Sequence, residues 1–107
     1  MGKAQRTKGH SWERAVVNEL KDIGYKATRI LEYQTENAKG TDVKCNGFNV
    51  QCKKAKNINV REAYREMQET DQINVVAANW DRDLTLAILD WSDFKTIMEW
   101  LKEKRIH

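Results

Sequence analysis

The chain has no proline and only two cysteines among its 107 residues. It is 40% hydrophobic and 33% charged, which is typical of a compact domain rather than a disordered segment, and its length suits one domain with one core. No stretch approaches the roughly 20 apolar residues that span a membrane. The basic N-terminus is followed by no apolar run, so we expect no signal peptide.

The two cysteines are expected to be free thiols. In the hairpin described below, Cys45 and Cys52 lie four residues apart along the strands, roughly 13 Å at the usual rise of a strand, whereas a disulfide needs Cα atoms within about 7 Å. Two thiols are also too few for a structural zinc site. Reduced, buried cysteines indicate a reducing compartment, so we expect a cytoplasmic protein.

Positive charge is concentrated in the first part of the chain. Residues 1–65 hold 14 Lys or Arg against 7 Asp or Glu, whereas residues 66–107 hold 5 against 9. A basic half predicts a polyanionic partner such as nucleic acid. The alternative is that these lysines and arginines only solvate the surface.

Apolar periodicity and turn residues predict the element order α-β-β-β-α-β-β-α. Residues 1–10 are expected to be a flexible basic arm, and residues 11–107 a single domain. Ser11 is the expected N-cap of the first helix, which Gly24 ends. The expected strands are 25–31, a hairpin over 41–54, 73–78 and 84–89. The other expected helices are 60–70 and one that begins at Asp90 or Ser92.

Tryptophan and the apolar side chains of the last helix are expected to be packed inside. We assign inward positions to Phe94, Ile97, Met98 and Leu101. Trp12, Trp91 and Trp100 fall at or beside the core faces of their helices. Trp80 is expected in a turn with residues 81–83, where either packing or stacking on a base would suit it.

Asn46-Gly47 lies between two alternating segments and predicts a two-residue hairpin turn of type I′. Residues paired across this turn sum to 93, so Asp42 is expected opposite Gln51. Alternation then divides the side chains between two faces. The polar face holds Asp42, Lys44, Asn49, Gln51 and Lys53, and the apolar face holds Val43, Cys45, Phe48, Val50 and Cys52.

The polar face of the hairpin has the groups that a phosphodiesterase site needs. Magnesium prefers hard oxygen ligands, which Asp42, the Gln51 amide and the backbone carbonyl of Cys52 would supply. Lys53, expected opposite Gly40 where there is room for substrate, would orient water and stabilise charge. The competing interpretations are a turn cap for Asp42, a solvent-facing residue for Gln51 and a solvated strand edge for Lys53.

A helix and a strand followed by Asp-x8-Gln-x-Lys resembles the PD-(D/E)XK nuclease superfamily. The N-terminal half is similar to the Holliday junction resolvases of archaeal and phage type. The matching stretches lie within residues 6–56: Lys8-Gly9-His10-Ser11-Trp12-Glu13-Arg14, Leu20 to Gly24-Tyr25, Ala27, Arg29, Gly40-Thr41-Asp42-Val43 and Gln51-Cys52-Lys53-Lys54.

The resemblance implies a restriction-endonuclease-like fold, a central mixed sheet flanked by helices, within an α/β (mixed α+β) chain. It implies Glu13 as a further metal ligand and catalytic residue beside Asp42, Gln51 and Lys53, with Mg²⁺ as the cofactor and Mn²⁺ as its substitute. Alternatively, Glu13 in a first helical turn could only interact favourably with the helix dipole. Gln51 departs from the family, which usually has an acid there. The loop 32–40 departs too, with Thr35 where the resolvases have a serine.

The expected function is a metal-dependent endonuclease that resolves branched DNA such as four-way junctions. Two symmetric cuts need two sites, so a homodimer is expected; a phage origin would place it in the host cytoplasm. The alternatives are a repair or restriction-type nuclease for linear or flapped DNA, a catalytically decayed DNA-binding protein, and an unrelated function such as an adaptor. The expected DNA contacts are Lys3, Arg6, Lys8, Arg14, Arg29, Lys44, Lys54 and Lys56, each of which could also be a plain surface charge.

Overall fold

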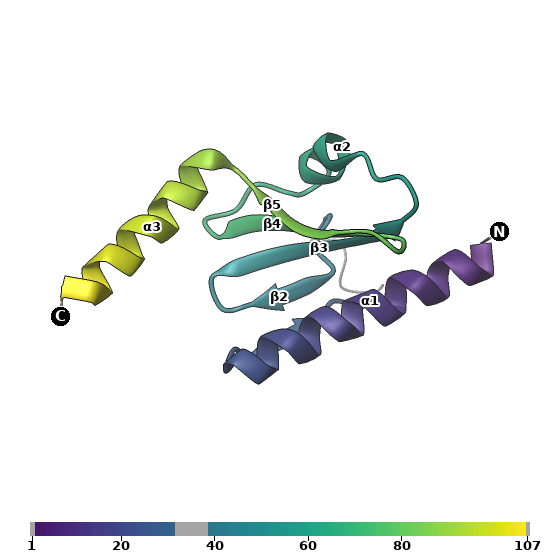
Figure 1. The fold of residues 1–107 in the computed structure, drawn as a ribbon, viewed down its shortest axis with the longest axis horizontal. Helices are drawn as coiled ribbons and strands as arrows, with labels where there is room; N and C mark the ends of the chain where they lie inside the picture. Colours follow the sequence, from purple (N-terminus) through teal and green to yellow (C-terminus); the bar gives the residue numbers. More distant parts are fainter. Residues whose placement is uncertain (1, 32–38, 107) are drawn as a thin grey trace.

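The computed structural model describes residues 2–31 and 39–106, and side chains within 9–31 and 39–104. The elements follow the predicted order: α1 (Gly2–Ile23), β1 (Ala27–Arg29), β2 (Val43–Cys45), β3 (Phe48–Ala55), α2 (Val60–Arg65), β4 (Ile73–Trp80), β5 (Thr85–Leu89) and α3 (Trp91–Ile106). The five strands form one mixed sheet in the order β1-β2-β3-β4-β5 (Figure 1). The chain is therefore a mixed α/β protein with a central sheet and flanking helices.

The two faces of the sheet are covered by different helices. β3 and β4 are parallel and joined by a crossover that contains α2, while the other neighbours are antiparallel. Val76 and Ala78 of β4 pack with Ala63 of α2, whereas the intervening Ala77 packs against the cluster that contains Val16 of α1. Since successive strand residues point to opposite faces, α1 and α2 lie on opposite sides of the sheet.

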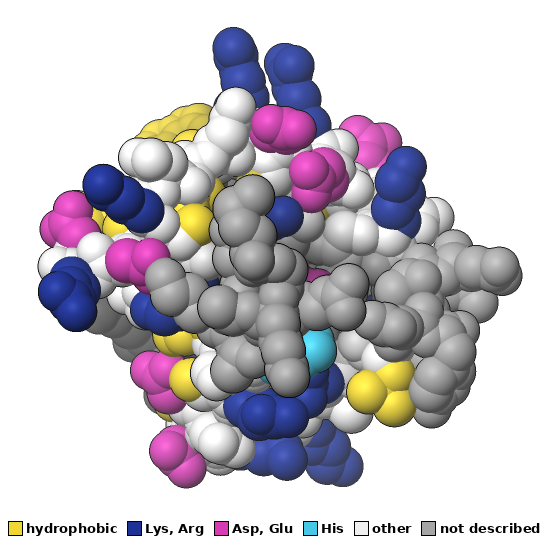
Figure 2. Space-filling view, turned by 90° about the vertical axis from the view of Figure 1, so that its right-hand side faces the viewer, with side chains coloured by type: hydrophobic (Ala, Val, Ile, Leu, Met, Phe, Trp, Pro, Cys, Tyr) yellow, Lys and Arg dark blue, Asp and Glu magenta, His cyan; other side chains and the backbone are white. Residues whose placement is uncertain are grey.

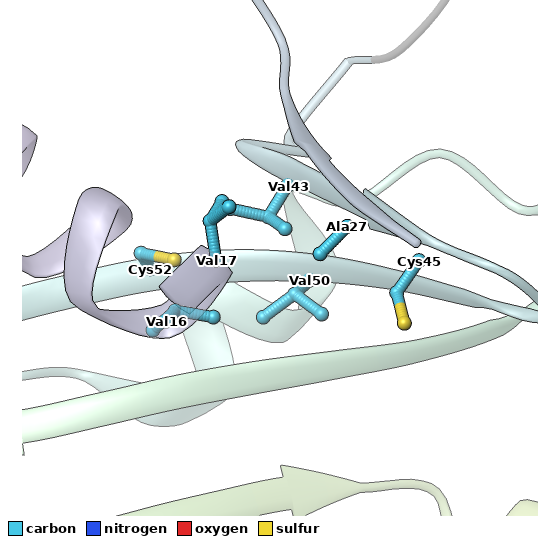
Figure 3. Close-up of a cluster of buried hydrophobic side chains, with 7 residues drawn as sticks. All are labelled: Val16, Val17, Ala27, Val43, Cys45, Val50 and Cys52. Carbon is cyan, nitrogen blue, oxygen red and sulfur yellow. The ribbon is translucent and has the colours of Figure 1, made fainter. Parts of the chain in front are cut away.

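The larger core lies between α1 and the first three strands. Figure 3 shows Val16 and Val17 of α1 directed at side chains of β1, β2 and β3. Val43 has no exposed surface, and Trp12 donates its Nε1–H to the carbonyl of Ala77 at 2.9 Å, which ties α1 to β4. The apolar face predicted for the hairpin is therefore confirmed as core, and both cysteines are free and buried as expected.

The first helix is longer than predicted. It begins at Gly2 rather than at Ser11, so Ser11 is not its N-cap and the residues before Ser11 continue the helix. The reason is local: this stretch lacks proline and is rich in residues of good helix propensity, such as Lys, Ala, Gln and Arg. The division into a flexible arm and a domain at residue 10 stays a prediction.

The second helix is shorter than the predicted 60–70. Asn59 caps it by accepting a hydrogen bond from Glu62 N, and it ends at Arg65. A tertiary contact ends it, because Gln68 N donates to the carbonyl of Lys39 instead of continuing the helix. Gly40 lies so close that an added Cβ would come within 2.6 Å of Glu66 O, so the room expected beside Gly40 is filled by the end of α2.

The hairpin has the predicted pairing for Val43–Val50, Lys44–Asn49 and Cys45–Phe48. The turn type is wrong. Gly47 has φ +89°, but Asn46 is not among the residues with positive φ, which is the sign pattern of type II rather than type I′. The pairing of Asp42 with Gln51 is wrong too, because Asp42 N donates to Val50 O at 2.8 Å, one residue out of register.

The last helix is the main departure from the expected packing. Trp91 is 69% exposed, and Phe94, Met98, Trp100 and Leu101 are also exposed. α3 leaves the sheet after β5 and points away from it (Figure 1), along a molecule whose longest extent is 51 Å. The inward assignments for α3 are therefore wrong, apart from the half-buried Ile97.

Two smaller points complete the fold. Trp80 ends β4, pairs with Ala55 and packs on the α2 cluster, so its placement in a turn is wrong. Among the helices of residues 2–31 and 39–106, none is long and apolar enough to cross a membrane.

Candidate functional site

Asp42 lies just before β2 begins, beside the middle of β3. Its Oδ2 accepts a hydrogen bond from the backbone N–H of Cys52 at 2.8 Å. The N–H and C=O of one strand residue point to the same side of the strand, so the Cys52 carbonyl faces the same side as the Asp42 carboxylate. The structure thus brings together the two oxygen groups that the sequence predicted as ligands.

The Asp42 carboxyl is in an electrostatically mixed environment. Burial raises its pKa above the ordinary value of 3.8, and the charge of Glu13 raises it further. The hydrogen bond from Cys52 and the charges of Lys53 and Arg29 act in the opposite direction. Glu13, Lys53 and Arg29 are therefore close enough to Asp42 to influence its charge.

Glu13 is held by an ion pair on the α1 side of the sheet. Arg29 of β1 donates to Glu13 Oε1 from Nε at 3.3 Å and from Nη2 at 3.2 Å. The two side chains are only 14% and 26% exposed. Arg29, predicted as a phosphate contact, therefore contacts a candidate metal ligand, and it neutralises part of the negative charge beside Asp42.

Gln51 and Lys53 share a carboxylate on the α2 side of the sheet. Gln51 Nε2 donates to Glu66 Oε2 at 3.0 Å, and Lys53 Nζ lies 3.5 Å from the same oxygen. Glu66 is the C-cap of α2. Glu66 was not among the site residues predicted from the sequence, because it fell in the middle of the helix expected over residues 60–70. The one sequence signal for Glu66 is that it is an acid at the end of α2, the element that follows Lys53 of β3.

The buried amide of Gln51 has an unused acceptor. Gln51 is 5% exposed, and its Oε1 finds no hydrogen-bond partner among the described residues. A buried polar atom without a partner costs roughly 1–3 kcal/mol, so its retention calls for an explanation. The Asn49 Oδ1, nearer the start of β3, has the same status, but the Asn49 Nδ2 donates hydrogen bonds to Thr70 Oγ1 and to Asn74 Oδ1.

These donors suit a hard divalent cation in chemical type. Carboxylate, amide and backbone carbonyl oxygens are the ligands that Mg²⁺ accepts. In the described part of the chain no group of three or more His, Cys, Asp or Glu side chains comes together as a metal site. A cation here would therefore depend on the oxygens of Gln51 and Cys52 as well as on Glu13 and Asp42.

A hollow of about 290 Å³ adjoins the Lys53–Glu66 pair and extends along the start of α2. A larger hollow of about 490 Å³ lies elsewhere, between the end of α2 and the start of α3. Its lining includes Glu69, Asp71, Asp90 and Asp93, which would repel phosphate. The smaller hollow, which Lys53 and Lys54 line, suits a polyanion better than the larger one.

The predicted DNA contacts differ in their environments. Arg14, Lys44 and Lys56 are exposed, whereas Lys54 Nζ is tied to Asn79 at 2.9 Å and to Asp81 at 3.7 Å. The side chains of Lys3, Arg6 and Lys8 lie outside the described residues, as does Thr35. Figure 2 views the end of the molecule near the N-terminus, where Lys and Arg side chains gather beside a histidine and acidic side chains are scattered.

The fold and the site define a class of protein, a mixed α/β domain with charged and amide side chains gathered where β2 begins beside β3. Comparison with protein-family models, with curated proteins and with solved structures finds no match.

Proposed function

We propose that this chain is a metal-dependent endodeoxyribonuclease of the restriction-endonuclease-like fold, acting on branched DNA such as four-way junctions. The observation that carries the proposal is a half-buried Asp42 carboxylate within electrostatic range of Glu13 of α1 and Lys53 of β3, beside the strand that also holds the unpartnered Gln51 Oε1. The basic first half of the chain supports a polyanionic substrate.

Each side chain has a definite task in this proposal. Asp42 and Glu13 provide the anionic oxygens for Mg²⁺, and the Gln51 amide and Cys52 carbonyl provide neutral ones. Bound Mg²⁺ would supply Lewis-acid activation of water and neutralise charge on the phosphate. Lys53 orients the attacking water and stabilises negative charge, and Glu66 restrains both Lys53 and the Gln51 amide.

Arg29 tunes this site in the proposal. Paired with Glu13, it keeps two neighbouring carboxylates from repelling each other before metal enters. With that charge neutralised by a bound cation, the Arg29 guanidinium would be free to contact a phosphate. Two cuts on a junction require two such sites, so we propose that the active form is a homodimer.

The direct test is incubation of the purified chain with a labelled four-way junction, with Mg²⁺ or with chelator. We expect cutting with Mg²⁺ alone, and none from Asp42→Ala or Lys53→Ala, while both variants still bind the junction. Full cutting by both variants would sink the site assignment. Equal cutting of a junction, a flap and a linear duplex would favour the repair or restriction-type alternative.

A non-catalytic DNA-binding protein is the second candidate. It is favoured by the neutral Gln51 and by the ion pairs that already occupy Glu13 and Glu66. Calorimetry with Mn²⁺ separates the two candidates. Absence of metal binding, together with DNA binding that weakens with salt, would support the non-catalytic function.

A further inference from the structure

The apolar side chains of α3 form a continuous stripe that nothing in the described chain covers. Trp91, Phe94, Met98 and Leu101 recur at intervals of three, four and three residues, the spacing that aligns side chains along one seam of a coiled coil. They are between 39% and 69% exposed. The Trp91 and Phe94 rings stack with centroids 5.6 Å apart, which makes the start of the stripe one apolar surface.

The rest of the fold offers this stripe no partner. The first turn of α3 lies near Tyr64, whose pKa is raised by burial and by Asp93 and Asp90. Beyond that turn, α3 does not pack along the sheet or along α1 or α2 in the described residues, as Figure 1 shows. An exposed apolar patch of this kind marks an interaction surface.

We propose that a second copy of this chain covers the stripe, through antiparallel pairing of the two α3 helices about a two-fold axis. Such a pairing is isologous, so each helix supplies the same surface to the other. Antiparallel seams place the first apolar position of one heptad opposite the second of the partner. Trp91 then lies against Leu101 of the partner subunit, and Phe94 against Met98 of the partner subunit.

The charges of α3 favour this partner and this direction. The start of the helix region has two acids, Asp90 and Asp93, against Lys95 alone. The second half has three basic residues, Lys102, Lys104 and Arg105, against two acids, Glu99 and Glu103. In this register, antiparallel pairing sets Asp90 beside Lys102 of the partner subunit at both ends of the seam and leaves Asp93 and Glu99 on outer positions, whereas parallel pairing sets Asp90 and Lys102 each against its own copy.

The size of the stripe is also suitable. Aromatic side chains offer about 150–250 Å² each, so these four residues leave roughly 400 Å² of apolar surface uncovered per chain. A standard interface buries roughly 800 Å² per partner, a little over half of it apolar. A 16-residue helix spans about 24 Å, which gives room for the charged flanks to supply the remainder.

Sedimentation velocity or light scattering over a concentration series tests the proposal on the full chain. We expect a concentration-dependent dimer, and we expect Met98→Glu to weaken it by at least about tenfold, because each dimer would bury two added carboxylates. Trp100→Glu is the matched control: Trp100 is 48% exposed against 50% for Met98, but lies away from the stripe. A monomer at every concentration, or equal effects of the two variants, would overturn the proposal.

Oxidative cross-linking tests the direction. A chain with Trp91→Cys and Leu101→Cys should form a disulfide-linked dimer, and Trp91→Cys alone should not, since only parallel helices bring two copies of position 91 within about 7 Å. The reverse pattern overturns the antiparallel arrangement. The readout is oligomeric state, so a monomer that still cuts DNA would refute this interface and leave the proposed nuclease standing.

Discussion

α1 and α3 are both long helices with regular apolar stripes, but only α1 is covered by its own chain. Val16 and Val17 of α1 are 7% exposed each and face three strands, whereas the stripe of α3 is largely exposed. Periodicity therefore reveals which side of a helix is apolar, and not what covers that side. Each region has a different expected use, chemistry beside α1 and self-association along α3.

The largest expected difference between the regions is in catalysis. Replacing Asp42 by Ala should lower junction cleavage by roughly 1,000-fold or more, because a metal ligand contributes several kcal/mol to stabilising the transition state. Glu99→Ala on α3 removes a carboxylate of the same charge far from the site, and cleavage at concentrations that maintain the dimer should stay within about twofold. Single-turnover cleavage rates at saturating enzyme measure both, and a comparable loss in the two variants would remove the distinction.

A second difference concerns stability. Val43→Ala removes buried methyl groups from the α1 core, where Val43 has no exposed surface, and should lower the free energy of unfolding by about 1–3 kcal/mol. Met98→Ala should change it by less than about 0.5 kcal/mol, because Met98 is half exposed in the monomer. Denaturant unfolding at concentrations that favour monomer checks this. A larger cost for Met98→Ala would mean that α3 packs on its own chain.

A smaller effect on cleavage is expected at Glu66, which contacts two candidate site residues. Glu66→Ala removes the partner of both Gln51 and Lys53 and should lower cleavage about tenfold, the usual scale for residues that orient metal ligands. Glu66→Gln keeps an acceptor for Gln51 but loses the charge that restrains Lys53, so its loss should be smaller. Glu62→Ala, which changes an exposed acid beside the same hollow, is the control. Cleavage and Mn²⁺ affinity should fall together in Glu66→Ala and stay unchanged in the control.

More of the candidate site than of the surrounding surfaces could be predicted from the sequence. Alternation around Asn46-Gly47 predicted the core face and the shared face of Gln51 and Lys53, because strand periodicity is a local property, but it placed Asp42 one residue out of register. The sequence did not predict where α2 ends. The Gln68 N–H donates to the carbonyl of Lys39, a residue distant in the sequence, and local periodicity does not reveal such a contact. Glu66 was missed for that reason. The exposure of α3 was missed because the whole fold decides which other elements pack against a helix.

The smallest expected effect is a pH-dependent cost of the Asp42 charge in the region beside α1. Its folded pKa is raised, mainly by burial, so from the ordinary pKa of 3.8 up to the folded value the folded protein holds more proton than the unfolded one. Stability from this group is therefore present at low pH and is lost as pH rises through that window. Asp42→Asn keeps an acceptor for the Cys52 N–H but cannot ionise. Measured in chelator, the unfolding free energy of Asp42→Asn minus that of the wild type should rise across the window and then level off. A difference for Asp42→Asn that fell with pH would mean that the Asp42 charge stabilises the fold.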